Sequence, residues 1–289
     1  MTLSVFQSMW AMENQPWHGK PWTMAERVEK VAEAGFDGAG IDTYTPGKNP
    51  PATELAKLLD AAGLRSSVTV FVTENRPLAE GLRYAAELGA ELVVVCGEVF
   101  PASVTEAADL VTAWSQECGA VGIPMHLETH RYTLTNDLAF TAALASAVDV
   151  PLALDLSHYV VGNELPDPDD AGAERGRVQE MLEMLYVRGA SVQGRVATRE
   201  QIQVPLGWPP YQKAERRFET WWTDAFRSVR RRGPDQQCVF LCELGPYPYA
   251  LVGSDGVELS DRWSESQELA RRARVLFDLA ATAELPLQT

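Results

Sequence analysis

The sequence predicts a single (β/α)8 TIM barrel that spans residues 1–289. Eight short apolar segments alternate with longer segments whose apolar residues recur at helical spacing. The ionisable residues that stand out follow the later strand segments, as they do where parallel strands deliver side chains to one end of a barrel. An open doubly wound sheet is the rival architecture, but no Gly-rich phosphate-binding loop follows the first predicted strand.

The predicted strands are short apolar runs bounded by turn residues, and each is followed by a predicted helix. In chain order the strands span Leu3–Met9, Gly38–Asp42, Arg65–Val72, Leu92–Cys96, Pro124–Glu128, Pro151–Asp155, Ala190–Arg195 and Gln237–Glu243. The helices span Met24–Ala34, Ala52–Ala62, Arg76–Leu88, Val104–Ala120, Asp137–Val148, Ala171–Leu185, Tyr211–Arg231 and Ser264–Ala283.

Several helix boundaries carry their own signals. Polar residues that can cap a helix N-terminus precede or open three of the helices, namely Thr23, Ser103 and Asn136. Glycines follow the first three helices, where a left-handed residue is commonly needed: Gly35, Gly63 and Gly89. A strand begins shortly after each of these glycines, so we expect tight connections from helix to strand.

Composition and charge restrict the partners. The chain is 46% hydrophobic and 22% charged, as an ordinary globular protein is, and its net charge of −15 argues against binding nucleic acid. We therefore expect a small-molecule partner, without nucleic acid or membrane. The N-terminal residues lack a signal-peptide pattern, and the most apolar long segment is interrupted by Asp149 and Pro151. The four cysteines lack paired metal-binding spacing, so we expect buried free thiols and a cytoplasmic protein.

Long aromatic loops follow the first, seventh and eighth predicted strands. Trp10, Trp208 and Tyr247 are the candidates to line a substrate pocket there. These aromatics could equally pack the loops onto the barrel. The pair Trp221-Trp222 on the seventh predicted helix leaves a similar choice open, between an interface in a homo-oligomer and packing against the barrel wall.

Carboxylates end the fifth, sixth and eighth predicted strands. Glu128, Asp155 and Glu243 would therefore converge at the mouth of a barrel. Converging carboxylates repel one another unless they are protonated or a cation neutralises them, and sets of oxygen ligands suit hard divalent metals. A lone acid after a strand is commonly structural, but three in strand order predict one functional site.

The segments around these residues resemble the xylose isomerase-like TIM barrels, a superfamily of sugar isomerases and epimerases. The resemblance covers most of the chain. It rests on Leu-Glu128-Thr-His130-Arg, Leu-Asp155-Leu-Ser-His158, Gly-Arg195-Val with Gln203 beyond it, and Glu243-Leu-Gly-Pro, which match the superfamily pattern in order and strand position.

The resemblance implies one divalent cation, Mn²⁺, Mg²⁺ or Co²⁺. Its ligands would be Glu128, Asp155, Glu243 and a residue of the seventh strand, where the family usually has histidine and this chain has Gln193. An amide oxygen binds such a cation more weakly than imidazole does, so this departure predicts weaker metal binding or none.

The resemblance also implies an isomerase or epimerase of a polyhydroxylated carbonyl compound, acting by proton abstraction next to a carbonyl group. Glu128 and Glu243 would be its acid and base. Arg195 and His158 would hold substrate oxygens, and His130 is a weaker candidate for the same role.

Two alternatives stay open from the sequence. The first is a lyase on the same scaffold, a dehydratase or a C-glycoside-cleaving enzyme, because such a reaction begins with the same proton abstraction. The second is a metal-free barrel that binds a ligand without catalysis, and Gln193 is the residue that motivates it. The abasic-site endonucleases of the superfamily need more histidines and a basic groove, which this acidic chain does not offer.

Overall fold

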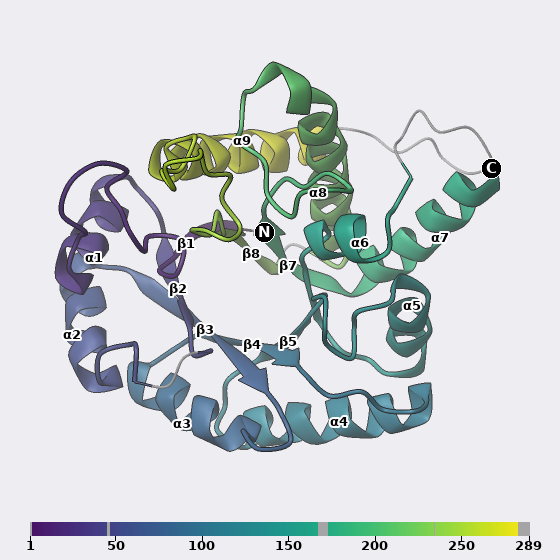
Figure 1. Ribbon diagram of the computed structural model, residues 1–289. Helices are drawn as coiled ribbons and strands as arrows, with labels where there is room; N and C mark the ends of the chain where they lie inside the picture. Colours follow the sequence, from purple (N-terminus) through teal and green to yellow (C-terminus); the bar gives the residue numbers. More distant parts are fainter. Residues whose placement is uncertain (1, 45–46, 167–172, 234, 283–289) are drawn as a thin grey trace.

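The computed structural model, which describes residues 2–44, 47–166, 173–233 and 235–282, confirms the predicted fold class. Eight parallel strands follow one another around a closed barrel, and β8 pairs with β1 to complete it (Figure 1). The strands are β1 (Thr2–Ser8), β2 (Gly38–Asp42), β3 (Arg65–Val72), β4 (Leu92–Gly97), β5 (Met125–Glu128), β6 (Leu152–Leu154), β7 (Gly189–Gly194) and β8 (Gln237–Cys242). Each lies within two residues of its predicted bounds.

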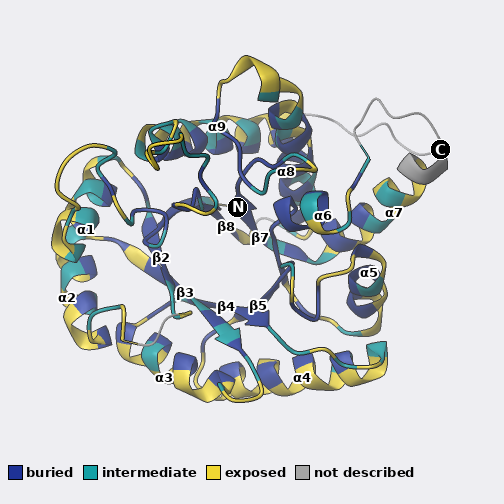
Figure 2. Cartoon of the chain, in the orientation of Figure 1, coloured by how far each residue is buried: buried dark blue, intermediate teal, exposed yellow. Residues whose placement is uncertain are grey.

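The helices surround the barrel, with their apolar sides buried against it and their polar sides exposed (Figure 2). They are α1 (Met24–Glu33), α2 (Ala52–Ala62), α3 (Leu78–Leu88), α4 (Val104–Ala120), α5 (Leu138–Ala147), α6 (Ser157–Gly162), α7 (Ala173–Arg188), α8 (Gln212–Arg231) and α9 (Arg262–Thr282). Residues 171, 172 and 283, which the sequence places in helices, lie outside the described residues.

Two short elements were not predicted. Helix α6 begins two residues after Asp155, and a 3₁₀ turn, η1 (Pro209–Tyr211), precedes α8. Six residues are too few to show helical periodicity, so no sequence pattern marks α6. This helix carries His158 back over the mouth of the barrel.

The N-caps of α1 and α4 are confirmed, and that of α5 is wrong by one residue. Thr23 and Glu26 form a capping box at α1, and the Ser103 side chain accepts a hydrogen bond from Glu106 N. Asp137 caps α5, while Asn136 Oδ1 instead accepts a bond from Tyr132 N. Because α5 begins at Leu138 rather than Asp137, the cap lies one position later than predicted.

The predicted glycine turns adopt the left-handed conformation, with φ of +75° at Gly35, +67° at Gly63 and +74° at Gly89. A side chain at these positions would be strained, so each glycine permits the chain to turn from helix to strand in two to four residues.

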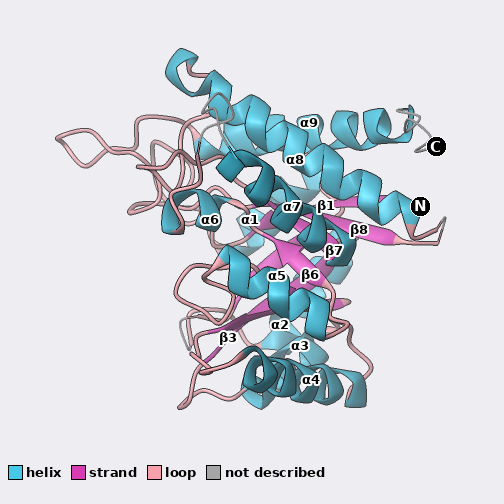
Figure 3. Ribbon diagram, turned by 90° about the vertical axis from the view of Figure 1, so that its right-hand side faces the viewer, coloured by secondary structure: helices cyan, strands magenta, loops and turns pink. Residues whose placement is uncertain are grey.

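The barrel interior is filled by side chains rather than open. A separate cluster of buried residues comes only from strands and consists of Phe6, Leu92, Val94, Ala153, Val239 and Leu241. The neighbouring strand positions point outward into the larger core beneath the helices. The packed interior leaves the carboxyl ends of the strands, where the long loops gather (Figure 3), as the place for a site.

Trp221 and Trp222 pack within the chain. Trp221 is 7% exposed and Trp222 is 1% exposed, and the Trp222 ring meets Phe240 of β8 edge-on at 5.3 Å. The structure therefore supports packing on the barrel wall for this pair, and a homo-oligomer stays a prediction. All four cysteines are buried and free, as expected. Among the described residues, no helix is long and apolar enough to cross a membrane.

One buried guanidinium ties the first loop to the last strand and helix. Arg262, the first residue of α9, is 1% exposed. It donates hydrogen bonds to the carbonyl oxygens of Ala11, Glu13 (2.8 Å) and Leu244 (3.0 Å), and it pairs with Glu258 at 2.7 Å. These contacts fix the position of the loop after β1 relative to the end of β8.

Candidate active site

Three carboxylates converge at the carboxyl end of the barrel, as the sequence predicts. Glu128 is the last residue of β5, and Asp155 and Glu243 directly follow β6 and β8. One oxygen from each carboxylate lies within 4.8 Å of the others. Glu128 is 3% exposed, Asp155 is fully buried and the Glu243 side chain is 17% exposed, so substrate could reach the cluster from the Glu243 side.

Arg195, directly after β7, lies against two of these carboxylates. Its Nη2 donates to Asp155 Oδ2 and, at 3.1 Å, to Glu243 Oε2. Its Nε donates to Ser157 Oγ at 3.2 Å, and its guanidinium lies 4.9 Å from the Tyr249 ring centre. Burial alone would lower the pKa of Arg195, but the two carboxylates outweigh it and raise that pKa. Arg195 therefore stays charged and is an internal cation for Asp155 and Glu243.

Both oxygens of Asp155 are engaged. Oδ1 accepts hydrogen bonds from the backbone N and the hydroxyl of Ser157, and Oδ2 faces Arg195 and lies 3.4 Å from His158 Nε2. Thr129 Oγ1 accepts a bond from Asp155 N at 2.8 Å. These contacts fix the carboxylate in a single orientation.

Glu128 is the third carboxylate of the cluster, and its negative charge is compensated less than the charges of Asp155 and Glu243. Gln193 of β7 donates from Nε2 to Glu128 Oε2 at 3.2 Å. Burial raises the pKa of Glu128 well above its ordinary value, and the negative charges of Glu243 and Asp155 raise it further. Glu128 is therefore the carboxyl group most inclined to hold a proton.

Glu243 titrates closer to neutral pH. Burial raises its pKa to about 7, against the opposing effect of Arg195. Asp42, at the end of β2, has its pKa raised to about 6 by burial, and its carboxylate accepts a bond from Tyr44 N at 2.6 Å. Asp42 thus closes a turn after β2.

Two imidazoles stand beside Glu128. The rings of His130 and His158 have centres 3.8 Å apart and are tilted by 46°. His130 Nδ1 lies 2.6 Å from the carbonyl oxygen of Arg131, whereas neither ring nitrogen of His158 has a hydrogen-bond partner in the described part of the chain. Burial lowers the pKa of His130 to about 4 and lowers that of His158 well below its ordinary value, so both rings are neutral near pH 7.

The other two histidines lie away from this cluster. His126 Nδ1 lies 2.9 Å from Ser191 Oγ, and the His18 ring stacks on Trp17 with centres 4.7 Å apart. Neither ring belongs to a group of possible metal ligands among the described residues.

The predicted aromatic wall is only partly at the site. Trp10 packs edge-on against Tyr249 at 5.0 Å, and Gly245 lies so close that an added Cβ would be 2.0 Å from the Trp10 ring. Trp208 is 36% exposed and Tyr247 is 67% exposed, so both lie farther toward solvent. Tyr249, which contacts Arg195, was not selected from the sequence, and its only signal was its place in the aromatic loop after β8.

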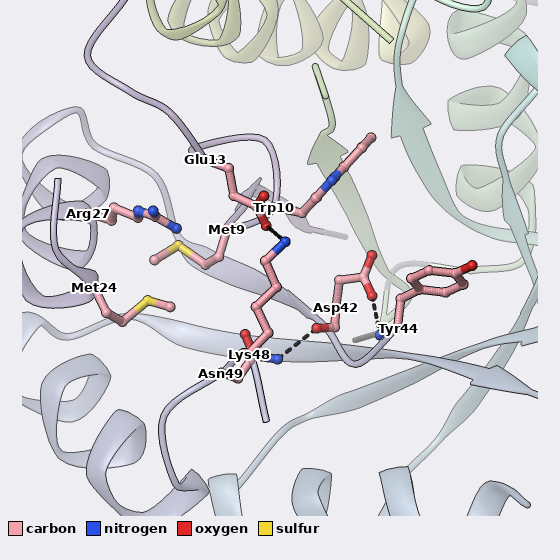
Figure 4. Close-up of a pocket in the computed structure, with 9 residues that line it drawn as sticks. All are labelled: Met9, Trp10, Glu13, Met24, Arg27, Asp42, Tyr44, Lys48 and Asn49. Atoms are coloured by element: carbon pink, nitrogen blue, oxygen red, sulfur yellow. Dashed lines mark hydrogen bonds and ion pairs between the residues drawn. The ribbon is translucent and has the colours of Figure 1, made fainter. Parts of the chain in front are cut away.

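A cavity of about 190 Å³ opens on the β1–β2 side of the mouth (Figure 4). Asp42 lines it, and the negative charge of Asp42 also raises the pKa of Glu243. Lys48 and Glu13 form an ion pair of 2.6 Å across it, and Asn49 Nδ2 donates to the Asp42 carbonyl oxygen at 2.7 Å. Its lining residues are Met9, Trp10, Glu13, Met24, Arg27, Asp42, Tyr44, Lys48 and Asn49.

Two sets of buried side chains could bind a metal ion. One is Glu128, Asp155 and Glu243, and the other is Glu128, His130 and His158. The first set matches the sequence prediction, but Arg195 contacts two of its members and Gln193 turns its amide nitrogen to the third. The second set offers two neutral imidazoles, and the only charged group that an ion-pair contact of the described residues brings to either of them is Asp155, whose Oδ2 lies 3.4 Å from His158 Nε2. The donor chemistry therefore fits a divalent cation, and Glu128 is common to both sets.

Comparison with known proteins supports the fold. No family model matches the chain, and no curated protein matches it in sequence. Among solved structures, it is similar to D-psicose 3-epimerase with D-tagatose from Clostridium cellulolyticum H10, at 15% identity and a TM-score of 0.55, over 97% of this chain and 98% of that one. It is also similar to a xylose isomerase-like TIM barrel protein from Mycobacterium smegmatis in complex with magnesium, at 16% identity and a TM-score of 0.58. That match covers 95% of this chain and 97% of the other.

A third similar structure carries another type of activity in its name. The probable 3-DHS dehydratase involved in petrobactin synthesis from Bacillus anthracis shares 12% identity at a TM-score of 0.52, over 94% of this chain and 98% of that one. The resemblance to the xylose isomerase-like TIM barrels is thus confirmed in the fold. Neighbours with this fold include epimerases, isomerases and a dehydratase.

Proposed function

We propose that the protein is an isomerase or epimerase of a small polyhydroxylated carbonyl compound. The observation that carries this proposal is the pair of carboxyl groups with raised pKa, Glu128 and Glu243, which offer oxygens within 4.8 Å of each other and of Asp155. Two such groups in one mouth suit the removal of a proton from one face of a carbon and its return from another group.

The two glutamates would have different starting roles. Glu243, with a pKa of about 7, is substantially ionised at neutral pH and would accept the proton from the carbon next to the carbonyl. Glu128, with its pKa raised further, would supply a proton. Return to the same carbon from the opposite side gives an epimer, and return to the neighbouring carbon gives an isomer.

Arg195 would stabilise the charge that develops during this transfer. Its Nη1 is buried and has no hydrogen-bond partner among the residues that the structure describes. A donor of this kind, held rigidly by Ser157 and Asp155, can bond a substrate oxygen as that oxygen becomes negative. His158 and His130 would bind further substrate oxygens, with Trp10 beside them and Trp208 and Tyr247 nearer to solvent.

The residues also fit a divalent cation, and we propose that Mn²⁺, Mg²⁺ or Co²⁺ assists the reaction. When bound, such an ion polarises the substrate carbonyl and stabilises the enediolate charge. The sequence prediction assigns it to Glu128, Asp155, Gln193 and Glu243. Glu128 would hold it in either candidate set.

The test is solvent deuterium exchange. The protein is incubated in D₂O with a panel of ketoses and aldoses, and the recovered sugars are analysed for deuterium next to the carbonyl. We expect exchange with at least one sugar and its loss in Glu128→Gln and Glu243→Gln. Glu117→Gln, an exposed position on α4, is the matched control and should keep full exchange. Exchange that survives both active-site substitutions would contradict the proposal.

A lyase is the second candidate, and the similarity to a dehydratase structure favours it. The same base would remove the proton, and a water molecule or another group would then leave. Product analysis in the same experiment separates the two, because a lyase releases a group and an epimerase returns the whole sugar. Ligand binding without either outcome would instead support the binding barrel.

A further inference from the structure

The two sides of the carboxylate cluster differ in what they have left to bind. On the Arg195 side, both oxygens of Asp155 and one oxygen of Glu243 already accept hydrogen bonds. A cation between Asp155 and Glu243 would have to displace the Arg195 guanidinium, which is 1% exposed, bonded to Ser157 and packed on Tyr249. Expelling a buried charge from its partners is costly, so this position is already filled by the protein itself.

Gln193 does not complete a metal site on that side. Its amide nitrogen, which cannot ligate a cation, faces Glu128 at 3.2 Å. The residue that the resemblance implies as the fourth ligand therefore serves as a hydrogen-bond donor to a carboxylate.

The histidine pair beside Glu128 has unsatisfied nitrogen atoms. His158 is 1% exposed, and neither of its ring nitrogens forms a hydrogen bond in the described residues, although Nε2 lies 3.4 Å from Asp155 Oδ2. A buried polar atom left without a partner destabilises a fold by about 1–3 kcal/mol, so its presence requires an explanation. One nitrogen of His158 lies within 4.8 Å of both a nitrogen of His130 and an oxygen of Glu128.

His130 is already oriented as a metal-binding histidine is. Its Nδ1 lies 2.6 Å from the backbone carbonyl of Arg131, which requires the proton to be on Nδ1. The lone pair is then on Nε2. A ring nitrogen that donates to a backbone carbonyl is the usual companion of a metal-ligating histidine, because it fixes both the tautomer and the ring orientation.

We propose that a divalent metal is held by Glu128, His130 and His158, while Arg195 neutralises Asp155 and Glu243 in its place. Two imidazoles and one carboxylate form a ligand set that suits Mn²⁺, Fe²⁺, Co²⁺ or Zn²⁺ better than Mg²⁺, which prefers oxygen ligands throughout. Three protein ligands would leave further coordination positions of such an ion for water or substrate.

A spectroscopic measurement on the unmodified protein tests the ligand set directly. Chelated protein, made with ¹⁵N-labelled histidine, is loaded with Mn²⁺, and electron spin-echo spectroscopy records magnetic coupling between the metal and nitrogen. We expect coupling to histidine nitrogen. The alternative set of Glu128, Asp155, Gln193 and Glu243 binds through oxygen and gives no histidine coupling. Bound Mn²⁺ without such coupling, or no Mn²⁺ binding at all, overturns the proposal.

Variants then identify the histidines whose nitrogen atoms bind the metal. His130→Gln and His158→Gln should each weaken Mn²⁺ affinity by about 100-fold, since each removes one of three ligands, whereas even supporting residues cost about 10–100-fold. Gln193→Leu should leave the affinity within about threefold. His126→Gln, which removes the half-buried histidine of β5, is the matched control. Loss of binding in Gln193→Leu with no loss in the two histidine variants would return the metal to the set expected from the sequence.

The metal site and the proposed reaction can fail separately. Histidine-coupled Mn²⁺ in a protein that exchanges no sugar proton would leave the metal site standing and remove the isomerase. Proton exchange by a protein that binds no metal would support the isomerase and remove the metal site. Circular dichroism and thermal unfolding of each variant separate loss of a ligand from loss of the fold.

Discussion

The Asp155–Glu243–Arg195 side of the barrel mouth and the Glu128–His130–His158 side show opposite solutions to burying polar groups. On the first side, the chain supplies its own cation, and short contacts satisfy the carboxylates. On the second side, His130 Nδ1 bonds the Arg131 carbonyl oxygen, whereas the two buried ring nitrogens of His158 form no hydrogen bond in the described chain. The first side is complete in the free protein, whereas the second is complete only with a ligand. One cluster can therefore combine side chains that contacts within the protein already hold with side chains whose polar atoms are satisfied only by a ligand.

Substitution of the glutamates should have the largest effect. Glu243→Gln and Glu128→Gln each remove one proton-transfer group, one from each side of the cluster, and general acid–base catalysis contributes about 10²–10⁴-fold. We expect kcat/KM to fall by that factor in either variant, measured as the rate of deuterium incorporation into the sugar. A fall in Glu243→Gln alone would show that Glu128 serves only binding.

The second largest effect should be on the free energy of unfolding, which should differ between variants of the two sides of the cluster. Arg195→Met leaves Asp155 and Glu243 without their cation and should lower the free energy of unfolding by about 3–5 kcal/mol at pH 7. His158→Leu removes nitrogens that have no partner and should be close to neutral, or stabilising, in the chelated protein. Urea unfolding of both variants, with chelator present, makes the measurement. Equal losses would mean that His158 is already satisfied without a ligand.

Metal should stabilise the ligand-dependent side alone. At a Mn²⁺ concentration 100 times its Kd, the free energy of unfolding of the wild type should rise by about 2.7 kcal/mol. His158→Leu should show a much smaller rise, and Gln193→Leu should show the full one. Thermal unfolding with and without Mn²⁺ gives the shift, and Mg²⁺ at equal concentration is the comparison ion.

The pH dependence of stability should reflect the Glu243 carboxyl. Its pKa in the folded chain is about 7 against an ordinary value of 4.5, so the folded state holds this proton more tightly than the unfolded state does. Its contribution to stability is therefore complete below about pH 4.5 and is lost as the pH rises through about 7. The unfolding free energy of the chelated wild type should fall across this range more steeply than that of Glu243→Gln. Parallel curves would contradict the assignment.

The aromatic residues should show the smallest effects. Tyr247→Ala, at a side chain that is 67% exposed, should change the unfolding free energy by no more than about 0.5 kcal/mol. Trp10→Ala removes the ring that packs on Tyr249 beside Arg195 and should raise KM further than Tyr247→Ala does. Steady-state kinetics of the two variants measures the contrast. A larger rise in KM for Tyr247→Ala would place the substrate nearer to solvent.

The sequence predicted the parts of this site that depend on periodicity. Strand ends follow from the apolar pattern, so Glu128, Asp155 and Glu243 could be placed at one end of the barrel before any coordinates. The glycine turns and two of three helix caps followed from local backbone preferences in the same way. Their roles, with those of Gln193 and the substrate-binding residues, stay predictions.

Contacts among side chains could not be predicted. Whether Arg195 contacts a substrate or Asp155 depends on the rotamer of its side chain, which Ser157 and the Tyr249 ring help to fix. Arg195, Ser157 and Tyr249 come from three different segments of the chain. The meeting of His130 and His158 likewise depends on the short helix α6, which no periodic pattern announces. Three-dimensional neighbours of this kind are set by register and packing, so they emerge only from the folded chain.

The buried Arg262 has a consequence for synthesis of the protein on the ribosome. The loop after β1, which carries Trp10, is joined through this guanidinium to the end of β8. Arg262 follows Ala11 by 251 residues, so the ribosome makes this loop well before its anchor. The wall that Trp10 forms can therefore reach its final position only after Arg262 has been translated, and a nascent chain halted before residue 262 would lack a finished binding surface.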